Sequence, residues 1–282
     1  MSSKKNFVES KYINPYTDFG FKKFFGTEAN KDVLQHFLQT LLQLKGQINQ
    51  LHYLNNERLG RSEEDRRAVF DIYCETDSGE KFIVEMQKAK QKFFKDRSVY
   101  YSSFPIQEQA KQGNWNFELN AVYTVGILDF VFDENKSDPD KYYYHVQLSD
   151  TDTHEIFYDK LTFVYLEMPK FTKTEDELET LFDKWLFVLK NLPNLQNRPK
   201  ALQERVFQRL FQIAAIERLT PNERRAYDES LKIYWDLNNV IDTAVEEAVM
   251  EVIKVKDEVI KEKDNTIAEM SKIIEKLQQQ LQ

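Results

Sequence analysis

The segment from Ala68 to Gln87, AVFDIYCETDSGEKFIVEMQ, limits the possible folds of this chain more than any other segment. Two runs rich in β-branched and aromatic residues flank the turn 77–79, and its final glycine suits a three-residue hairpin loop with a left-handed last residue. In that register Asp71 lies directly opposite Glu85, with Cβ atoms about 4.5–5.5 Å apart. The segment therefore predicts an antiparallel hairpin that brings two carboxylates together.

Strand alternation places Asp71 on the same side of the hairpin as Glu85 and Gln87, while Phe70 and Cys74 face the opposite side. Two like charges opposed on a sheet are destabilising unless something lies between them, and Mg²⁺ is commonly held by one or two carboxylates with water and phosphate. The Gln87 amide would then orient an attacking water. The alternative is that both carboxylates point into solvent from an exposed sheet face.

The residues around the hairpin read as an α/β protein with a mixed sheet. Asp18 opens a short helix that Gly26 closes, and Asn30 is a candidate N-cap for the second helix. We expect helices over 18–26, 31–44 and 94–113, and strands over 47–59, 68–76, 81–89 and 120–132. The run at 120–132 is almost continuously apolar, which is typical of a buried central strand.

The second half of the chain predicts further strands over 142–150 and 155–168, then helices over 174–192 and 200–235. From about residue 237 the chain contains no Gly or Pro. Apolar residues recur there every seven positions and at the intermediate heptad position, although two lysines occupy earlier intermediate positions: Ile253, Ile260, Ile267, Ile274 and Leu281; Met270 and Leu277; Lys256 and Lys263. This pattern predicts a coiled coil that makes a homo-oligomer, with a helix folded back on its own domain as the alternative.

These patterns divide the chain into three expected parts. Residues 1–133 form the core that carries the hairpin, 134–236 form an extension packed on that core, and 237–282 form the C-terminal helix. The chain has one cysteine, Cys74, which excludes a disulfide framework and a cysteine-rich zinc site, and its four histidines lack metal-ligand spacing. No signal-like segment and no run of about 18 apolar residues occurs, so we expect a cytoplasmic protein that does not enter a membrane.

The net charge of −8 conceals a mildly basic first part. Residues 1–113 carry 18 Lys and Arg against 15 Asp and Glu, whereas 114–282 carry 21 against 32. The densest basic cluster directly follows the hairpin and contains Lys88, Lys90, Lys92, Lys95 and Arg97. Because phosphate binding depends on local patches, this cluster makes DNA a candidate partner, with a solvated surface as the alternative.

Four stretches, in order along the chain, resemble one protein family. The spacing from Asp71 to Glu85 and Gln87 resembles the signature of the PD-(D/E)XK nuclease superfamily in its Glu-x-Gln form. The surroundings resemble the recombination-promoting nuclease and transposase branch over residues 12–235, in the stretches NPYTDFGFKKFFG, FDIYCETDSGEKFIVEMQ, RSVYYSS and LEMPKF. Phe70 replaces the proline of the signature and Gln87 replaces its lysine; the second change resembles a variant within this branch.

The resemblance implies a restriction-endonuclease-like α-β-β-β-α-β core and a DNA endonuclease that depends on Mg²⁺ or, in its place, Mn²⁺. It implies catalytic roles for Asp71, Glu85 and Gln87, with the two acids as metal ligands. Asp18 would add a further acid, or it would only cap its helix. Lys22, one turn later, would contact phosphate or remain solvated.

Two functions from different classes follow from these observations. The first is a metal-dependent DNA endonuclease, which the joint occurrence of Asp71, Glu85 and Gln87 favours. The second is a catalytically weak or inactive nuclease-fold protein that acts as a DNA-binding or coiled-coil assembly module. The missing lysine at position 87 keeps the second function open.

Overall fold

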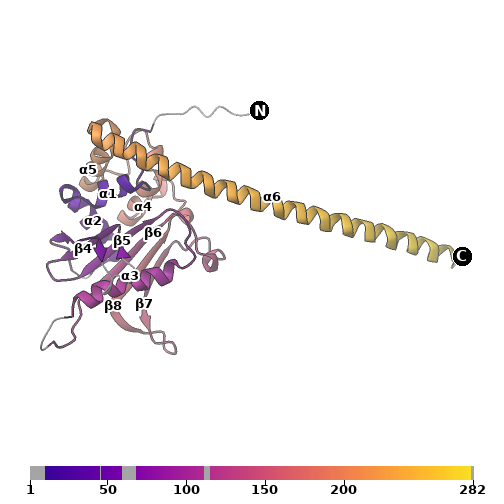
Figure 1. Ribbon diagram of the computed structural model, residues 1–282, viewed down its shortest axis with the longest axis horizontal. Coiled ribbons are helices and arrows are strands. Elements are labelled where there is room, and N and C mark those ends of the chain that lie inside the picture. Colours follow the sequence, from indigo (N-terminus) through magenta and orange to yellow (C-terminus); the bar gives the residue numbers. More distant parts are fainter. Residues whose placement is uncertain (1–9, 45, 59–67, 111–114, 281–282) are drawn as a thin grey trace. The chain divides into compact units, whose positions relative to one another are not determined.

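The computed structural model describes residues 10–44, 46–58, 68–110 and 115–280. Its main sheet has six strands in the order β1-β4-β5-β6-β8-β7, and the α/β class with a mixed sheet is confirmed (Figure 1). The strands are β1 (Leu51–Tyr53), β4 (Ile72–Thr76), β5 (Lys81–Gln87), β6 (Val122–Leu128), β7 (Tyr143–Ser149) and β8 (Ile156–Glu167). β5, β6 and β8 run parallel to one another, and the remaining pairs of this sheet are antiparallel.

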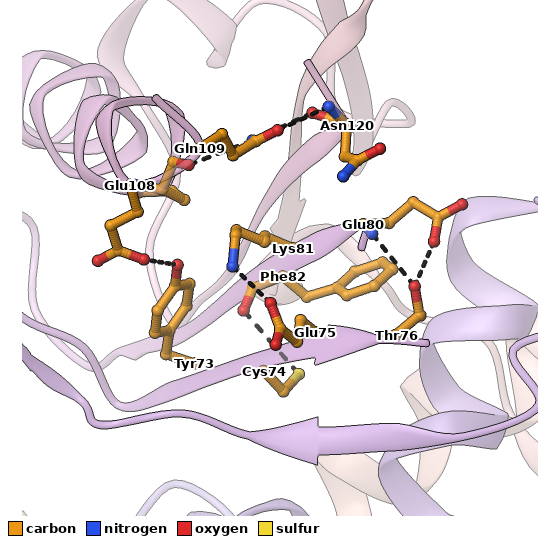
Figure 2. Close-up of polar contacts among 11 residues, drawn as sticks. Tyr73, Cys74, Glu75, Thr76, Glu80, Lys81, Phe82, Glu108, Gln109 and Asn120 are labelled. Carbon is orange, nitrogen blue, oxygen red and sulfur yellow. Dashed lines mark hydrogen bonds and ion pairs between the residues drawn. The ribbon is translucent and has the colours of Figure 1, made fainter. Parts of the chain in front are cut away.

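The hairpin of β4 and β5 has the register that the turn predicts. Ile72 pairs with Val84 and Cys74 pairs with Phe82, as a three-residue loop at 77–79 requires. At the turn end, the amide of Thr76 donates to the Glu80 carbonyl at 3.0 Å. Figure 2 shows that the hydroxyl of Thr76 also accepts from the Glu80 amide at 3.2 Å and donates to the Glu80 carboxylate. Gly79 has a φ of +90°, in the left-handed region that glycine tolerates best.

Helices cover both faces of the sheet. The face with Tyr73, Ile83 and Glu85 lies under α3 (Phe94–Glu108), and the hydroxyl of Tyr73 donates to Oε2 of Glu108 at 2.7 Å (Figure 2). The other face meets α1 (Asp18–Phe25), α2 (Lys31–Leu42) and α4 (Leu181–Asn191). Contacts such as the bond from the Tyr53 hydroxyl to the carbonyl of Phe25 hold these helices to the sheet.

Aromatic side chains fill the helical layer around Trp185, which is fully buried. Trp185 contacts Phe25, Phe37 and Phe207, which come from α1, α2 and α5 (Arg205–Ala214). The indole N–H of Trp185 donates to Nδ1 of His36 at 3.1 Å. His36 therefore serves packing, in line with its lack of ligand spacing in the sequence.

Several expected element boundaries were wrong. The strand expected over 47–59 is divided into β1 and the short strand β2 (Glu57–Arg58), which pairs with β3 (Ala68–Val69) in a separate two-stranded sheet. The helix expected over 94–113 is α3, which contains Pro105 and ends at Glu108; residues 111–114 lie outside the described ranges. The second helix ends at Leu42, where Gln43 takes a left-handed conformation.

Phe70 does not lie on the Cys74 side of the hairpin, as alternation predicted. It packs with Tyr73 and Ile83 beneath α3, because the chain bends at Asp71 between β3 and β4 and the alternation restarts there. Asp18 does not cap its helix either. Thr17 is the N-cap of α1, since its hydroxyl oxygen accepts from the amide of Gly20 at 2.9 Å.

The chain divides into two compact units, Met1–Ser230 and Leu231–Gln282, and the boundary falls within the long helix α6 (Pro221–Gln280). Its first turns form part of the sheet-bearing unit. The hydroxyl of Tyr227 accepts from the amide of Asn14 at 3.1 Å, and Oγ of Ser230 accepts from the amide of Phe19 at 3.1 Å. None of the helices in the described ranges is both long and apolar enough to cross a membrane.

Candidate functional site

The two carboxylates of the hairpin meet at the end of β4 and interlock through the main chain. The amide of Asp71 donates to Oε1 of Glu85 at 3.2 Å, and the amide of Met86 donates to Oδ2 of Asp71 at 2.8 Å. Asp71 lies one residue before β4, and Glu85 lies within β5. The bend at Asp71 and the regular strand beside it therefore fix both side chains against one another.

Burial makes this pair electrostatically unfavourable when both groups are charged. Glu85 is only 5% exposed, and its burial, followed by the neighbouring charge of Asp71, raises its pKa to about 8. Burial is also the main reason that the pKa of Asp71 is raised, although the Met86 amide opposes the shift. The site thus has negative charge that its own environment does not fully compensate.

Arg97 supplies the nearest cation from α3. Its Nη2 lies 3.6 Å from Oε2 of Glu85, and its guanidinium lies over the rings of Phe94 and Tyr101, at 5.1 and 5.4 Å from their centroids. Gln91 accepts a hydrogen bond from Nη1, whereas Nη2 is buried and makes no hydrogen bond within the described residues. Arg97 is held in place by ring contacts and keeps unused donor capacity beside the carboxylates.

Gln87 lies beside the pair on the same face of β5. Its Nε2 donates to Oε2 of Glu85 at 3.3 Å, which is a long hydrogen bond. The predicted group of Asp71, Glu85 and Gln87 is therefore brought together on one side of the sheet.

The start of α1 contributes charged groups near Asp71. Asp18 raises the pKa of Asp71 and Lys22 lowers it, and the two residues form an exposed ion pair of 2.9 Å with each other. Lys88 is half-buried; desolvation lowers its pKa, while the charges of Asp18 and Asp71 act in the opposite direction. Asp18, Lys22 and Lys88 thus lie close enough to Asp71 to interact with it electrostatically.

The rest of the basic cluster faces other partners. Lys90 forms an ion pair with Asp133, and Lys95 forms one with Glu134. Lys92 lies over the ring of Phe93. The phosphate contacts expected from the sequence are Lys22, Lys88, Lys90 and Arg97. Of these, Lys22, Lys88 and Arg97 interact electrostatically with Asp71, whereas Lys90 pairs with Asp133.

One positioning residue, Asn56, has no signal in the local sequence. Its Nδ2 donates to the main-chain carbonyl of Asp71 at 2.9 Å, and its own carbonyl accepts from the amide of Phe70. Asn56 thereby holds the bend that separates β3 from β4. Because it precedes Asp71 by 15 residues, only the tertiary fold reveals this contact.

The donor set can be tested for its fit to a divalent metal ion. Among the described residues, no group of three or more His, Cys, Asp or Glu side chains could hold a metal. Two buried carboxyl groups do lie together, however, and burial raises the pKa of both, with the charge of Asp71 adding to the shift at Glu85. A bound dication would favour their charged forms. Mg²⁺ typically takes one or two carboxylates and completes its shell with water and substrate phosphate, so the Asp71 and Glu85 pair fits such an ion.

A mixed sheet with helices on both faces and two acids on its central hairpin defines an α/β protein consistent with the PD-(D/E)XK nuclease fold. The family described as PD-(D/E)XK nuclease family transposase matches residues 15–244, and the chain belongs to this family. No curated protein and no solved structure matches the chain.

Proposed function

We propose that this chain is a metal-dependent endonuclease that hydrolyses phosphodiester bonds in DNA. The observation that carries the proposal is the buried pair of Asp71 and Glu85, interlocked at 3.2 and 2.8 Å through main-chain amides. Family membership supports the nuclease class, and the pair gives that class a chemical centre. A buried carboxylate pair with raised pKa values is costly for stability, and such costs are common at catalytic sites.

In this proposal Asp71 and Glu85 hold Mg²⁺ or Mn²⁺, which when bound activates a water and stabilises the charge that develops on the phosphate. Gln87 orients the attacking water through its amide. Arg97 directs an unused donor beside Glu85, where a phosphate oxygen would accept it. Lys22 and Lys88 bind the flanking phosphates, and Asp18 acts as an additional acid near them.

The alternative is a nuclease-fold protein that binds DNA or assembles without cutting it. The observation that favours this alternative is Gln87, since a neutral amide occupies the position of the lysine in the common signature. Lys88 is close to Asp71 but follows Gln87 on the chain, so it does not occupy the same place.

Purified protein incubated with supercoiled plasmid, with Mg²⁺ or with EDTA, tests the proposal. We expect nicking or linearisation with Mg²⁺ only, and loss of cleavage in Asp71→Asn and Glu85→Gln. Asp77→Asn is the matched control, because Asp77 belongs to the same hairpin but pairs with His52 at the opposite end. Gln87→Lys should retain some activity. If Asp71→Asn cuts at the parent rate, the activity does not come from this site.

A further inference from the structure

The part of α6 after Asn239 carries apolar side chains that nothing in the described structure covers. Val252 is 60% exposed and Ile267 is 61% exposed, and every residue from 242 to 280 is exposed. Isolated exposed apolar residues are common, but a regular stripe along nearly forty residues of one helix is not. Such a stripe is the usual mark of a helix that has a partner.

The first half of the stripe follows an unbroken heptad pattern. Steps of four and three residues alternate through Ile241, Val245, Ala248, Val252, Val255 and Val259. In this frame Lys256 lies beside the stripe rather than in it. The seven-residue repeat that begins at Ile253 forms a second heptad frame, shifted by one residue from the first. After residue 259 the apolar contact positions of this second frame are Ile260, Ile267, Met270, Ile274 and Leu277. Leu281, which continues the repeat, lies outside the described residues.

The two frames join without leaving the same surface of the helix. From Val259 the stripe continues through Lys263 to Ile267, so that it advances 36 residues in ten steps between Ile241 and Leu277. The mean step of 3.6 residues equals the repeat of a straight α-helix, whereas a heptad coiled coil repeats every 3.5. Lys263 is the only polar residue on this stripe.

Charged residues that flank the stripe in its first frame indicate what covers it. In that frame Lys263 lies beside the stripe, and only the shift after Val259 brings it onto the stripe. Glu251 and Glu258 each precede a stripe valine, and Lys256 and Lys263 follow them by five residues. Five residues is the offset at which flanking positions of two parallel, in-register helices face each other, and Glu–Lys pairs there select partner and orientation. None of these four side chains makes an ion pair or hydrogen bond in the single chain as far as the structure describes it.

We propose that α6 beyond Asn239 pairs with the same helix of a second copy, parallel and in register, along a stripe that shifts by one residue near Val259. An antiparallel pair would instead bring Glu251 and Glu258 against glutamates and the two lysines against lysines. Because the stripe keeps a period of 3.6 residues, the two helices have little superhelical twist. This pairing does not depend on whether the nuclease site is active.

Disulfide trapping in the full chain tests both the orientation and the shift. Val255→Cys and Leu277→Cys should cross-link with their own copies at least about tenfold faster than Lys256→Cys and Lys276→Cys, because only the former pair lies within reach of a disulfide across the interface. Cys74 is fully buried, so the parent chain is the blank. Faster trapping at 256 than at 255 would overturn the shift, and no trapping at either 255 or 277 would overturn the parallel pair.

Charge reversal supplies a measurement that does not rely on cysteine chemistry. We expect two double variants to self-associate at least about tenfold more weakly than the parent in sedimentation: Glu251→Lys with Glu258→Lys, and Lys256→Glu with Lys263→Glu. An equimolar mixture of the two double variants should form a dimer again, because their flanking charges are complementary. A parent chain that sediments as a monomer at all concentrations tested would overturn the proposal. So would unchanged dimers in both double variants.

Discussion

Nη2 of Arg97 on α3 lies 3.6 Å from Oε2 of Glu85 on β5, and it makes no hydrogen bond within the described part of the chain. The guanidinium lies over the rings of Phe94 and Tyr101, and these two contacts restrict its position. A cation held in a fixed position beside two carboxylates can bind a negatively charged substrate through its remaining N–H donors.

Removal of this cation should reduce DNA cleavage. Arg97→Gln is expected to lower the plasmid-cutting rate about 10–100-fold, as is usual for a group that orients or balances a metal ligand. Lys95→Gln is the matched control, since Lys95 comes from the same helix but pairs with Glu134 at the surface. A rate for Arg97→Gln that equals the rate of Lys95→Gln would remove Arg97 from the site.

Glu85→Gln should increase the stability of the metal-free protein while it abolishes cleavage. Because its pKa is raised to about 8, Glu85 is mostly protonated at pH 7 in the folded chain but ionised in the unfolded chain, and this proton uptake opposes folding. A neutral amide of the same shape does not bear this cost, so the free energy of unfolding at pH 7 should rise by about 1–3 kcal/mol. Urea unfolding in EDTA measures this difference. We further expect Mg²⁺ to raise the melting temperature of the parent protein but not that of the variant. A destabilised variant would mean that the charge of Glu85 is well compensated without metal.

DNA affinity should depend on Lys22 and Lys88 more than on Lys90 and Lys95. Lys22, which is paired with Asp18, and Lys88 both interact with Asp71 at the candidate site, whereas Lys90 and Lys95 pair with Asp133 and Glu134. In a chain that also carries Asp71→Asn, which prevents cleavage, each lost phosphate contact should reduce the slope of log Kd against log salt concentration by about 0.9. Fluorescence anisotropy with duplex DNA at several salt concentrations measures the slope. Equal effects of all four alanine substitutions would favour a diffuse basic surface.

Gly79→Ala should destabilise the hairpin. Gly79 has a φ of +90°, and a Cβ at this position would lie 2.4 Å from Nδ2 of Asn120. The left-handed conformation alone costs an alanine about 1–2 kcal/mol, and the contact with Asn120 adds to this. Gly46→Ala is the control, because nothing lies within 4 Å of the added carbon. Thermal unfolding should separate the two variants clearly; similar melting temperatures would contradict the turn geometry.

The ion pair between Lys23 and Glu223 should make stability depend on pH. Hydrogen bonds from Lys23 and Thr220 lower the pKa of Glu223 from 4.5 to about 2. A lowered pKa stabilises the fold above pH 4.5, and this stabilisation is lost as the pH falls towards 2. The advantage of the parent over Glu223→Gln should therefore be present at pH 7 and shrink between pH 4.5 and pH 3. Urea unfolding at these pH values measures it, and a constant difference would exclude the charge as its cause.

The sequence predicted the hairpin register and the central strand, because both depend on local patterns. The turn 77–79 sets the register by its length, and an apolar run as long as that at β6 fits only a covered strand. The six-strand order could not be predicted from the sequence. β8 pairs with β6 and β7 lies at the edge of the sheet, and this order depends on contacts between segments that are distant in sequence. Element ends such as Leu42 and Glu108 were also beyond local patterns.

Within the candidate site, alternation identified the carboxylate pair but misplaced Phe70. The pattern assumed one continuous strand, whereas Asn56 holds a bend at Asp71 by a contact across 15 residues. The same limit applies to the basic cluster. Its density along the chain gave no information about which lysines would meet Asp133 and Glu134 from beyond β6.

The hydrogen bonds from Asn14 and Phe19 to Tyr227 and Ser230 affect the order of events during synthesis. Asn14 is synthesised 213 residues before Tyr227, and Phe19 is synthesised 211 residues before Ser230. The helix that carries Asp18 therefore completes its anchorage only when almost the whole sheet-bearing unit has been translated. Nascent chains shorter than 230 residues lack these hydrogen bonds, so α1 is anchored to α6 only after Ser230 has been translated.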